Sequence, residues 1–267
     1  MDNAKPFLRW AGGKKWLVKH LPQILNGLQF NKYYEPFLGG GVIFFELRPK
    51  QAQISDLCEP LIETYQQIQL NPKAVINLLK TYNNTEEDYY KIRELKLSDP
   101  IERAARFIYL NHTSFNGIYR ENSRGEYNVP YGFKKEYSID EKRIYNASIA
   151  LQGVEILSQD FEVIGEKVSQ GDLVFLDPPY TVSHNENGFV EYNQKIFKIE
   201  DQERLSNLID KIKEKRAFYI LTNAAHKKIE EIFDKGDKKL VLSRASTIGG
   251  INAKRETIKE YIFTNIK

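Results

Sequence analysis

The chain has 267 residues, enough to bury a full hydrophobic core in one large domain or in a domain with an insertion. Its 39 basic and 36 acidic residues leave a formal charge of +3, so a basic surface for a polyanion would have to be local. The single cysteine, Cys58, excludes an intramolecular disulfide and a cysteine-based zinc site.

The N-terminal residues lack the pattern of a signal peptide, and no apolar run is long enough to span a bilayer. We therefore expect a cytoplasmic protein without a membrane partner. Residues 7–14, Phe-Leu-Arg-Trp-Ala-Gly-Gly-Lys, predict a loop that enters an amphipathic helix at 16–25. Gly12 and Gly13 would let backbone N–H groups approach an anionic ligand, although a tight helix-entry turn explains the pair more simply.

A glycine loop follows the first predicted strand. Residues 33–41, Tyr-Tyr-Glu-Pro-Phe-Leu-Gly-Gly-Gly, predict a short strand ending in three glycines, and residues 42–47 predict a helix. This order is the first unit of a nucleotide-binding α/β fold, but the spacing is not that of a dinucleotide site. Residues 52–56 predict a second strand ending in Asp56, which suits a bond to ribose hydroxyls or a helix cap.

Helical patterns dominate from Pro60 onward. They run over residues 61–69, 72–82, 85–97 and 100–113. A parallel crossover rarely needs so many helices, so residues 60–148 are predicted to form an inserted helical domain. The main domain would then comprise residues 1–59 and 149–267.

A polar and aromatic segment, residues 114–132, lies inside the predicted insertion. It contains Arg120 and Arg124 among aromatic residues and glycines, and Lys134 and Lys135 follow it. Asparagine and arginine side chains read base edges, and aromatic rings wedge between bases. We therefore predict a hairpin that recognises DNA, in preference to an ordered surface loop.

The α/β pattern resumes after residue 148. Strands are predicted at 154–157, 173–176, 217–221, 240–242 and 258–264, and helices at 200–215 and 224–234. The last two strands form a predicted terminal pair around a glycine-rich segment at 246–255. The long polar loop at 181–197 is predicted to be mobile without DNA and to close over the bound base. The four histidines are scattered along the chain, so no metal is predicted.

The other strands are organised around residues 173–180, Leu-Val-Phe-Leu-Asp-Pro-Pro-Tyr. Four apolar residues suit a strand buried on both faces, and the prolines end it, which leaves Asp177 where open α/β sheets bind ligands. An exocyclic amine of a nucleobase must become pyramidal to attack a methyl group. The Asp177 carboxylate and the Pro178 carbonyl could accept its two hydrogens, while the Tyr180 ring holds the base by stacking. A strand with a proline-rich turn also explains the motif, since short motifs match by chance.

Together these motifs resemble those of the Dam-type DNA adenine-N6 methyltransferases (D12 class, alpha group), a family that includes modification enzymes of restriction systems. The resemblance covers nearly the whole chain in the family's order, with motifs at 7–14, 35–41, 54–56, 124–132 and 177–180. It implies a Rossmann-like class I methyltransferase sheet, α/β in class, with an inserted helical target-recognition domain. It also implies S-adenosyl-L-methionine as cofactor, no metal, double-stranded DNA as partner, a GATC target and a restriction endonuclease that acts separately.

The resemblance also implies the roles of individual residues. The catalytic residues would be Asp177, Pro178 and Tyr180. The cofactor site would be lined by Trp10, Gly12, Lys14, Glu35, Phe37, Gly39, Gly41, Asp56, Asp160, Phe161 and Asp177. DNA would be contacted by Arg9, Phe115, Asn116, Ile118, Arg120, Asn122, Arg124, Asn128 and Pro130. Position 9 is often lysine in the family; arginine also reaches guanine O6 and N7, but the two side chains are not interchangeable.

Other functions stay open from the residues. A cytosine-N4 methyltransferase typically has serine in place of Asp177, and a protein-glutamine methyltransferase typically has asparagine. A catalytically silent DNA-binding regulator would not need intact cofactor motifs. A longer DNA target that contains the GATC core also stays open.

Overall fold

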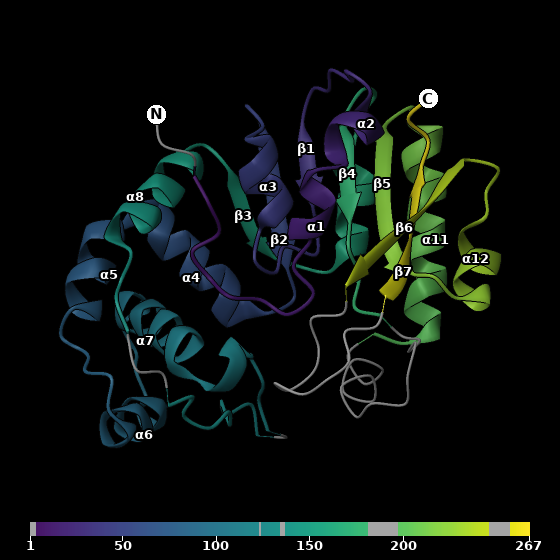
Figure 1. Ribbon diagram of the computed structural model, residues 1–267. Helices are drawn as coiled ribbons and strands as arrows, with labels where there is room; N and C mark the ends of the chain where they lie inside the picture. The colour runs from purple at the N-terminus through teal and green to yellow at the C-terminus, as the bar shows by residue number, and fades with distance from the viewer. Residues whose placement is uncertain (1–3, 123, 134–136, 181–196, 246–256) are drawn as a thin grey trace. The chain divides into compact units, whose positions relative to one another are not determined.

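The computed structural model describes residues 4–122, 124–133, 137–180, 197–245 and 257–267 (Figure 1). The chain divides into unit 1, with Met1–Lys15, Leu38–Lys50 and Ile54–Ser158, and unit 2, with Trp16–Phe37, Gln51–Gln53 and Gln159–Lys267. The predictions for Lys134, Lys135, the segment at 246–255 and all but the last residue of the loop at 181–197 lie outside the described residues. No helix in the described ranges is long and apolar enough to cross a membrane.

One mixed sheet contains the seven strands of the described residues, in the order β3-β2-β1-β4-β5-β7-β6. They are β1 (Tyr33–Glu35), β2 (Ala52–Asp56), β3 (Glu155–Ser158), β4 (Leu173–Leu176), β5 (Phe218–Ala224), β6 (Lys238–Ala245) and β7 (Thr257–Thr264). β4 pairs in parallel with β1 and β5, whereas β7 runs antiparallel to β5 and β6 (Figure 1). This arrangement confirms the predicted Rossmann-like α/β class and the terminal strand pair.

Unit 2 is built around β4, in which every residue is buried. An uninterrupted apolar run fits this position because both faces of the strand lie in the core. α11 (Ile199–Glu214) packs against β5 with Leu205 in the shared core, and α12 (Lys227–Phe233) adds Phe233 (Figure 1). The buried centre of unit 2 therefore positions Asp177, the residue that follows β4.

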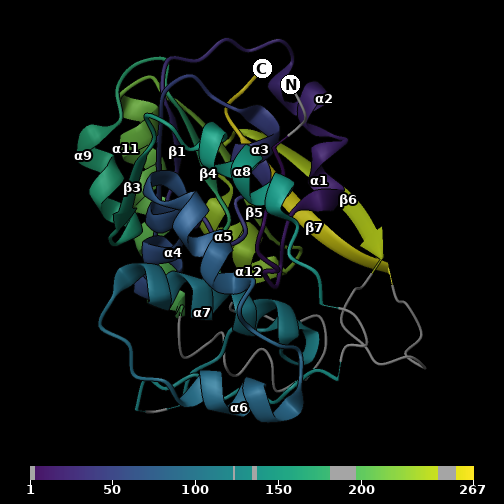
Figure 2. The ribbon, with the colours of Figure 1, turned by 90° about the vertical axis from the view of Figure 1, so that its left-hand side faces the viewer.

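Unit 1 is largely helical. Its helices are α3 (Val42–Leu47), α4 (Glu59–Leu70), α5 (Pro72–Leu79), α6 (Glu86–Glu94), α7 (Pro100–Thr113) and α8 (Glu141–Ala150). α7 is central, since it packs against α4, α5 and α6 (Figure 2). It begins where Asp99 accepts hydrogen bonds from the N–H groups of Ile101 and Glu102. The four predicted helical patterns between residues 61 and 113 are confirmed as α4 to α7.

Several predicted element boundaries are wrong. The helices expected at 72–82 and 85–97 end earlier, at Leu79 and Glu94. The helix expected at 16–25 is two short helices, α1 (Lys15–Val18) and α2 (Leu21–Leu25). Pro22 has no N–H group, so one continuous helix through it would lose a hydrogen bond. The strand expected at 217–221 continues to Ala224, because β5 stays paired with β7 as far as Glu260. The following helix therefore begins at Lys227 rather than at residue 224.

Candidate active site

The predicted catalytic turn lies in unit 2, directly after β4. Asp177 is half-buried, and its Oδ1 accepts a hydrogen bond from Thr222 Oγ1 at 2.7 Å. Thr222 lies on β5 and is fully buried. The two residues meet because Leu176 pairs with Leu221, so the next residue of each parallel strand lies at the same edge of the sheet. The Thr222 hydroxyl therefore fixes one oxygen of the predicted catalytic carboxylate.

Tyr180 is anchored through its hydroxyl group. The hydroxyl donates a hydrogen bond of 2.5 Å to Oε2 of Glu260, a fully buried residue on β7. The other Glu260 oxygen accepts a hydrogen bond from Nε of Arg244 on β6. Burial raises the pKa of Tyr180 well above its usual range, and the Glu260 charge raises it further, so the hydroxyl remains a donor. This network holds the ring that is predicted to stack on a base.

Two predicted cofactor residues of unit 2, Phe37 and Phe161, stack on each other with ring centroids 5.3 Å apart. Arg204 of α11 lies over the Phe161 ring, with its guanidinium carbon 4.8 Å from the ring centroid. The same guanidinium pairs with Asp160 at 2.8 Å. Asp160 and Phe161 are therefore both positioned by Arg204, a residue that the sequence analysis did not identify.

Glu35 ends β1 and is buried. Its Oε2 accepts a hydrogen bond from the Tyr33 hydroxyl at 2.9 Å. Burial raises the pKa of Tyr33, and the Glu35 charge raises it further, so the phenol stays protonated. A hydrogen-bonded carboxylate at the carboxyl end of a parallel strand suits a polar group of a ligand.

The glycine loop lies in unit 1, and Asp56 holds its backbone. Gly39 donates its N–H to Asp56 Oδ2 and Cys58 donates its N–H to Oδ1, both at 3.0 Å. Burial raises the pKa of Asp56, and these backbone hydrogen bonds oppose the rise. Gly39 has a φ of +46°, and a Cβ there would lie 2.6 Å from the Trp10 ring. The contact of Asp56 with ribose stays a prediction.

Trp10 contacts both the glycine loop and the predicted DNA hairpin within unit 1. Its ring stacks on Tyr119 with centroids 5.8 Å apart and an interplanar angle of 19°. Lys14 is buried, and its Nζ donates to the Gly12 carbonyl at 3.0 Å. Gly12 is exposed, and Gly41 immediately precedes α3. Trp10, Gly12 and Lys14 thus belong to one segment of unit 1, which contacts the glycine loop through the Trp10 ring.

Residues 114–122 and 124–132 form the predicted hairpin, also in unit 1. Antiparallel bridges join Ser114 to Tyr131 and Glu121 to Tyr127. At its tip, Asn122 Oδ1 accepts hydrogen bonds from the backbone N–H groups at positions 124 and 126, at 2.9 and 3.0 Å. An asparagine turn of this kind closes the hairpin without further regular structure.

The residues predicted to contact DNA all lie in unit 1, and none of the nine is buried. Arg120 projects from the hairpin with its Nε donating to Asn128 Oδ1 at 2.8 Å. Phe115 is 54% exposed and begins the single turn η1 (Phe115–Gly117), where Asn116 has a φ of +55°. A large exposed ring on a fixed turn suits insertion into a base stack.

Three residues that support this site were not found from the sequence: Thr222, Glu260 and Arg204. Each lies on a strand or helix far along the chain from the motif that it supports. The position of Thr222 could have been inferred, because parallel strands end at the same edge of the sheet. Glu260 and Arg204 carry no comparable signal, since charged residues on a terminal strand or an amphipathic helix usually face solvent.

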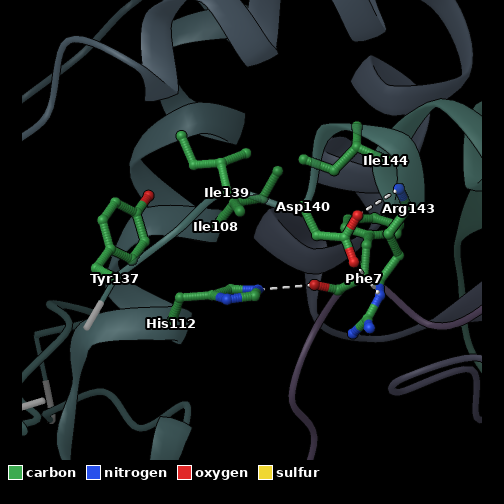
Figure 3. Close-up of a pocket in the computed structure, with 8 residues that line it drawn as sticks. All are labelled: Phe7, Ile108, His112, Tyr137, Ile139, Asp140, Arg143 and Ile144. Atoms are coloured by element: carbon green, nitrogen blue, oxygen red, sulfur yellow. Dashed lines mark hydrogen bonds and ion pairs between the residues drawn. The ribbon is translucent and has the colours of Figure 1, made fainter. Parts of the chain in front are cut away.

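The cavity in Figure 3 contains none of the predicted site residues. Its volume is about 20 Å³, which is room for a single water molecule. It is lined by Phe7, Ile108, His112, Tyr137, Ile139, Asp140, Arg143 and Ile144. This cavity is too small for a nucleotide-sized ligand.

Comparison with known proteins identifies the family. The profile of the D12 class N6 adenine-specific DNA methyltransferases matches residues 10–248. The type II methyltransferase M1.LlaDCHI of Lactococcus lactis subsp. cremoris is 37% identical, over 98% of this chain and 96% of its own. Two further relatives are M.MjaIII of Methanocaldococcus jannaschii (35%, over 82% and 84%) and the DNA adenine methylase of Haemophilus influenzae (31%, over 97% and 92%).

The chain therefore belongs to the D12 class N6 adenine-specific DNA methyltransferases. It is an adenine-specific DNA methyltransferase that uses S-adenosylmethionine as methyl donor and DNA as substrate, as the sequence analysis predicted. The chemistry of the residues fits this cofactor. Within unit 1, the Asp56 carboxylate suits hydroxyl groups and the Trp10 ring suits a planar base. Within unit 2, Asp160 is a second carboxylate that suits a hydroxyl group.

Proposed function

We propose that the chain transfers a methyl group directly to N6 of an adenine that is flipped out of duplex DNA, with Asp177, Pro178 and Tyr180 as catalytic residues. The observation that carries the proposal is the Asp177 carboxylate, which follows β4 and is fixed by the buried Thr222 hydroxyl. A fixed acceptor lowers the cost of ordering the amine for reaction.

In this proposal the protein prepares the adenine, and bound S-adenosylmethionine would supply an electrophilic methyl group. The methyl–sulfur bond would break as the bond to N6 forms, S-adenosylhomocysteine would leave, and the surplus N6 proton would pass to solvent. Asp177 and the Pro178 carbonyl accept the two amine hydrogens, which directs the N6 lone pair out of the ring plane. The Tyr180 ring stacks on the base and is held through Glu260. Burial raises the pKa of Cys58 to about 12, so its thiol stays protonated, in keeping with transfer without a cysteine adduct.

The cofactor residues proposed from the resemblance are named for each unit by itself. In unit 1 they are Trp10, Gly12, Lys14, Gly39, Gly41 and Asp56, and in unit 2 they are Glu35, Phe37, Asp160, Phe161 and Asp177. Support comes from local geometry: Asp56 holds the glycine loop, and Arg204 holds Asp160 and Phe161.

We further propose that residues 60–148 recognise the target and that the target is GATC. Arg120 would grip one guanine through O6 and N7, and Arg9 would grip the outer guanine. Ile118 and Pro130 would touch a thymine methyl group, while Phe115 and Asn116 would fill the gap left by the flipped adenine. The exposure of these side chains supports the assignment, and GATC itself rests on the resemblance to Dam-type enzymes.

Methylation mapping on a randomised duplex library tests the proposed target. N6-methyladenine confined to GATC is the expected result. Methylated adenine in another context would refute the specificity and leave the chemistry in place. A cognate restriction endonuclease is proposed as a separate partner, and cleavage of unmethylated but not methylated DNA by a neighbouring gene product would test it.

A further inference from the structure

The buried side-chain amide of Asn111, near the end of α7, holds the main chain of Arg9. The Arg9 N–H donates to Asn111 Oδ1 at 2.8 Å, and Asn111 Nδ2 donates to the Arg9 carbonyl at 2.7 Å. Asn111 is 3% exposed, whereas Arg9 is exposed. Two hydrogen bonds to one residue fix both the position and the orientation of the Arg9 backbone, as a rung of a β-ladder does.

The same amide also contacts the base of the DNA hairpin. Asn111 Nδ2 lies 3.3 Å from the carbonyl oxygen of Gly117, in the turn that carries Phe115 and Asn116. Gly117 has a φ of +64°, and a Cβ there would lie 2.8 Å from Arg9 Cδ. The Arg9 side chain therefore packs on the bare glycine backbone. Asn111 and Gly117 together determine where Arg9 lies relative to the hairpin.

A second contact from α7 holds the same N-terminal segment. The His112 ring places Nε2 2.8 Å from the Phe7 carbonyl oxygen, as Figure 3 shows. Asn111 and His112 both lie near the end of α7, which is packed in the core of unit 1. α7 is therefore a rigid reference for the segment that carries Arg9 and for the turn that begins the hairpin.

We infer that Asn111 is a positioning residue for base recognition, which keeps Arg9 in register with the hairpin. The inference rests on the proposed role of Arg9 in reading a base. A bidentate arginine contact requires two guanidinium nitrogens to meet two acceptors at once. Releasing the Arg9 backbone should therefore reduce discrimination at that base pair more than it reduces kcat.

The test compares Asn111→Leu with the control Thr113→Val. Leucine has the same number of side-chain heavy atoms and the same branch point as asparagine, but it cannot hydrogen-bond the Arg9 backbone. Thr113 is fully buried near the end of the same helix, and its Oγ1 bonds to the Tyr109 carbonyl within α7. The measured quantity is kcat/KM on duplexes with the mapped target and with each single base-pair change.

Asn111→Leu should reduce discrimination by about tenfold or more at the base pair that Arg9→Ala relaxes. Losses at other base pairs, caused by the lost contact with the Gly117 carbonyl, should be smaller. Its kcat on the cognate duplex should stay near the wild-type value, and Thr113→Val should keep all discrimination. At that base pair, the double variant with Arg9→Ala should lose no more discrimination than Arg9→Ala by itself, because Asn111 acts there through Arg9. Additive losses, an equal loss at every base pair, or no loss would overturn the inference.

Gly117→Ala provides a second test if Asn111→Leu does not fold. Its Cβ would meet Arg9 Cδ and would strain a backbone held at a φ of +64°, so discrimination should fall most at the same base pair. Unchanged discrimination at that base pair would overturn the inference. The result for Arg9→Ala distinguishes the role of Arg9 from the role of Asn111. If Arg9→Ala leaves discrimination intact at every base pair, the proposed reading role of Arg9 fails first, and the role of Asn111 fails with it.

Discussion

Replacing Thr222 with valine removes the hydroxyl that holds Asp177 and keeps a β-branched side chain of nearly the same shape. Thr222 is fully buried, so water cannot readily replace the 2.7 Å hydrogen bond. A hydrogen bond to a charged group contributes about 1.5–3 kcal/mol. Since about 1.4 kcal/mol corresponds to a tenfold change in rate, loss of this orientation should slow methyl transfer roughly 10- to 100-fold.

The assay for this prediction is single-turnover transfer of a tritiated methyl group from S-adenosylmethionine to a duplex target. Thr264→Val is the matched control, because Thr264 is also fully buried and its Oγ1 donates to the Tyr219 carbonyl at 2.6 Å. The same oxygen accepts a hydrogen bond from the Ile266 N–H at 3.2 Å. The control should lose about 1–3 kcal/mol of unfolding free energy, because the Ile266 N–H loses its acceptor, and it should keep its rate. Equal transfer rates for Thr222→Val and Thr264→Val, whether slow or unchanged, would refute the role given to Thr222.

Three further predictions concern mechanism, pH and specificity. Asp177→Ala should abolish methyl transfer, while its affinity for DNA, measured by fluorescence anisotropy, should stay the same. Cys58→Ala should stay active. A Cys58→Ala variant that is folded but inactive would rule out direct transfer without a cysteine adduct. Burial raises the pKa of Tyr180, whereas an unfolded tyrosine loses its proton at about pH 10. Above about pH 10 the native state therefore binds more protons than the unfolded state, so the free energy of unfolding should fall as pH rises. Urea unfolding should show a smaller fall for Tyr180→Phe. Arg120→Ala should cost about 1–3 kcal/mol of discrimination at one base pair. Lys134→Ala should weaken binding to all sequences alike and reduce its salt dependence. In competition binding, a uniform loss for Arg120→Ala or a loss at one base pair for Lys134→Ala would contradict these predictions.

Local sequence patterns account for most of the fold. The four apolar residues before Asp177 form a strand buried on both faces, as their lack of polar breaks predicts. The helices between residues 61 and 113 follow from their apolar periodicity. The errors arose where one residue or a distant strand decides the boundary. Pro22 divides one predicted helix, and pairing with Glu260 lengthens β5.

Without the resemblance, the candidate site could be predicted only where its residues are neighbours in sequence. Asp177, Pro178 and Tyr180 share one turn, so their association follows from the motif itself. Thr222 and Glu260 reach that turn through strand register and the order of the sheet, which local patterns do not specify. Resemblance to a family located the motifs, but not the side chains that hold them in place.

The most direct test of the proposed chemistry is to identify the methylated nucleoside. Wild-type protein and Asp177→Ala are incubated with tritiated S-adenosylmethionine and duplex DNA of mixed sequence, and the DNA is then digested and its nucleosides separated. The proposal predicts that wild-type protein places all of the label in N6-methyladenine and that Asp177→Ala places none. Label in N4-methylcytosine, or N6-methyladenine still formed by Asp177→Ala, would contradict it.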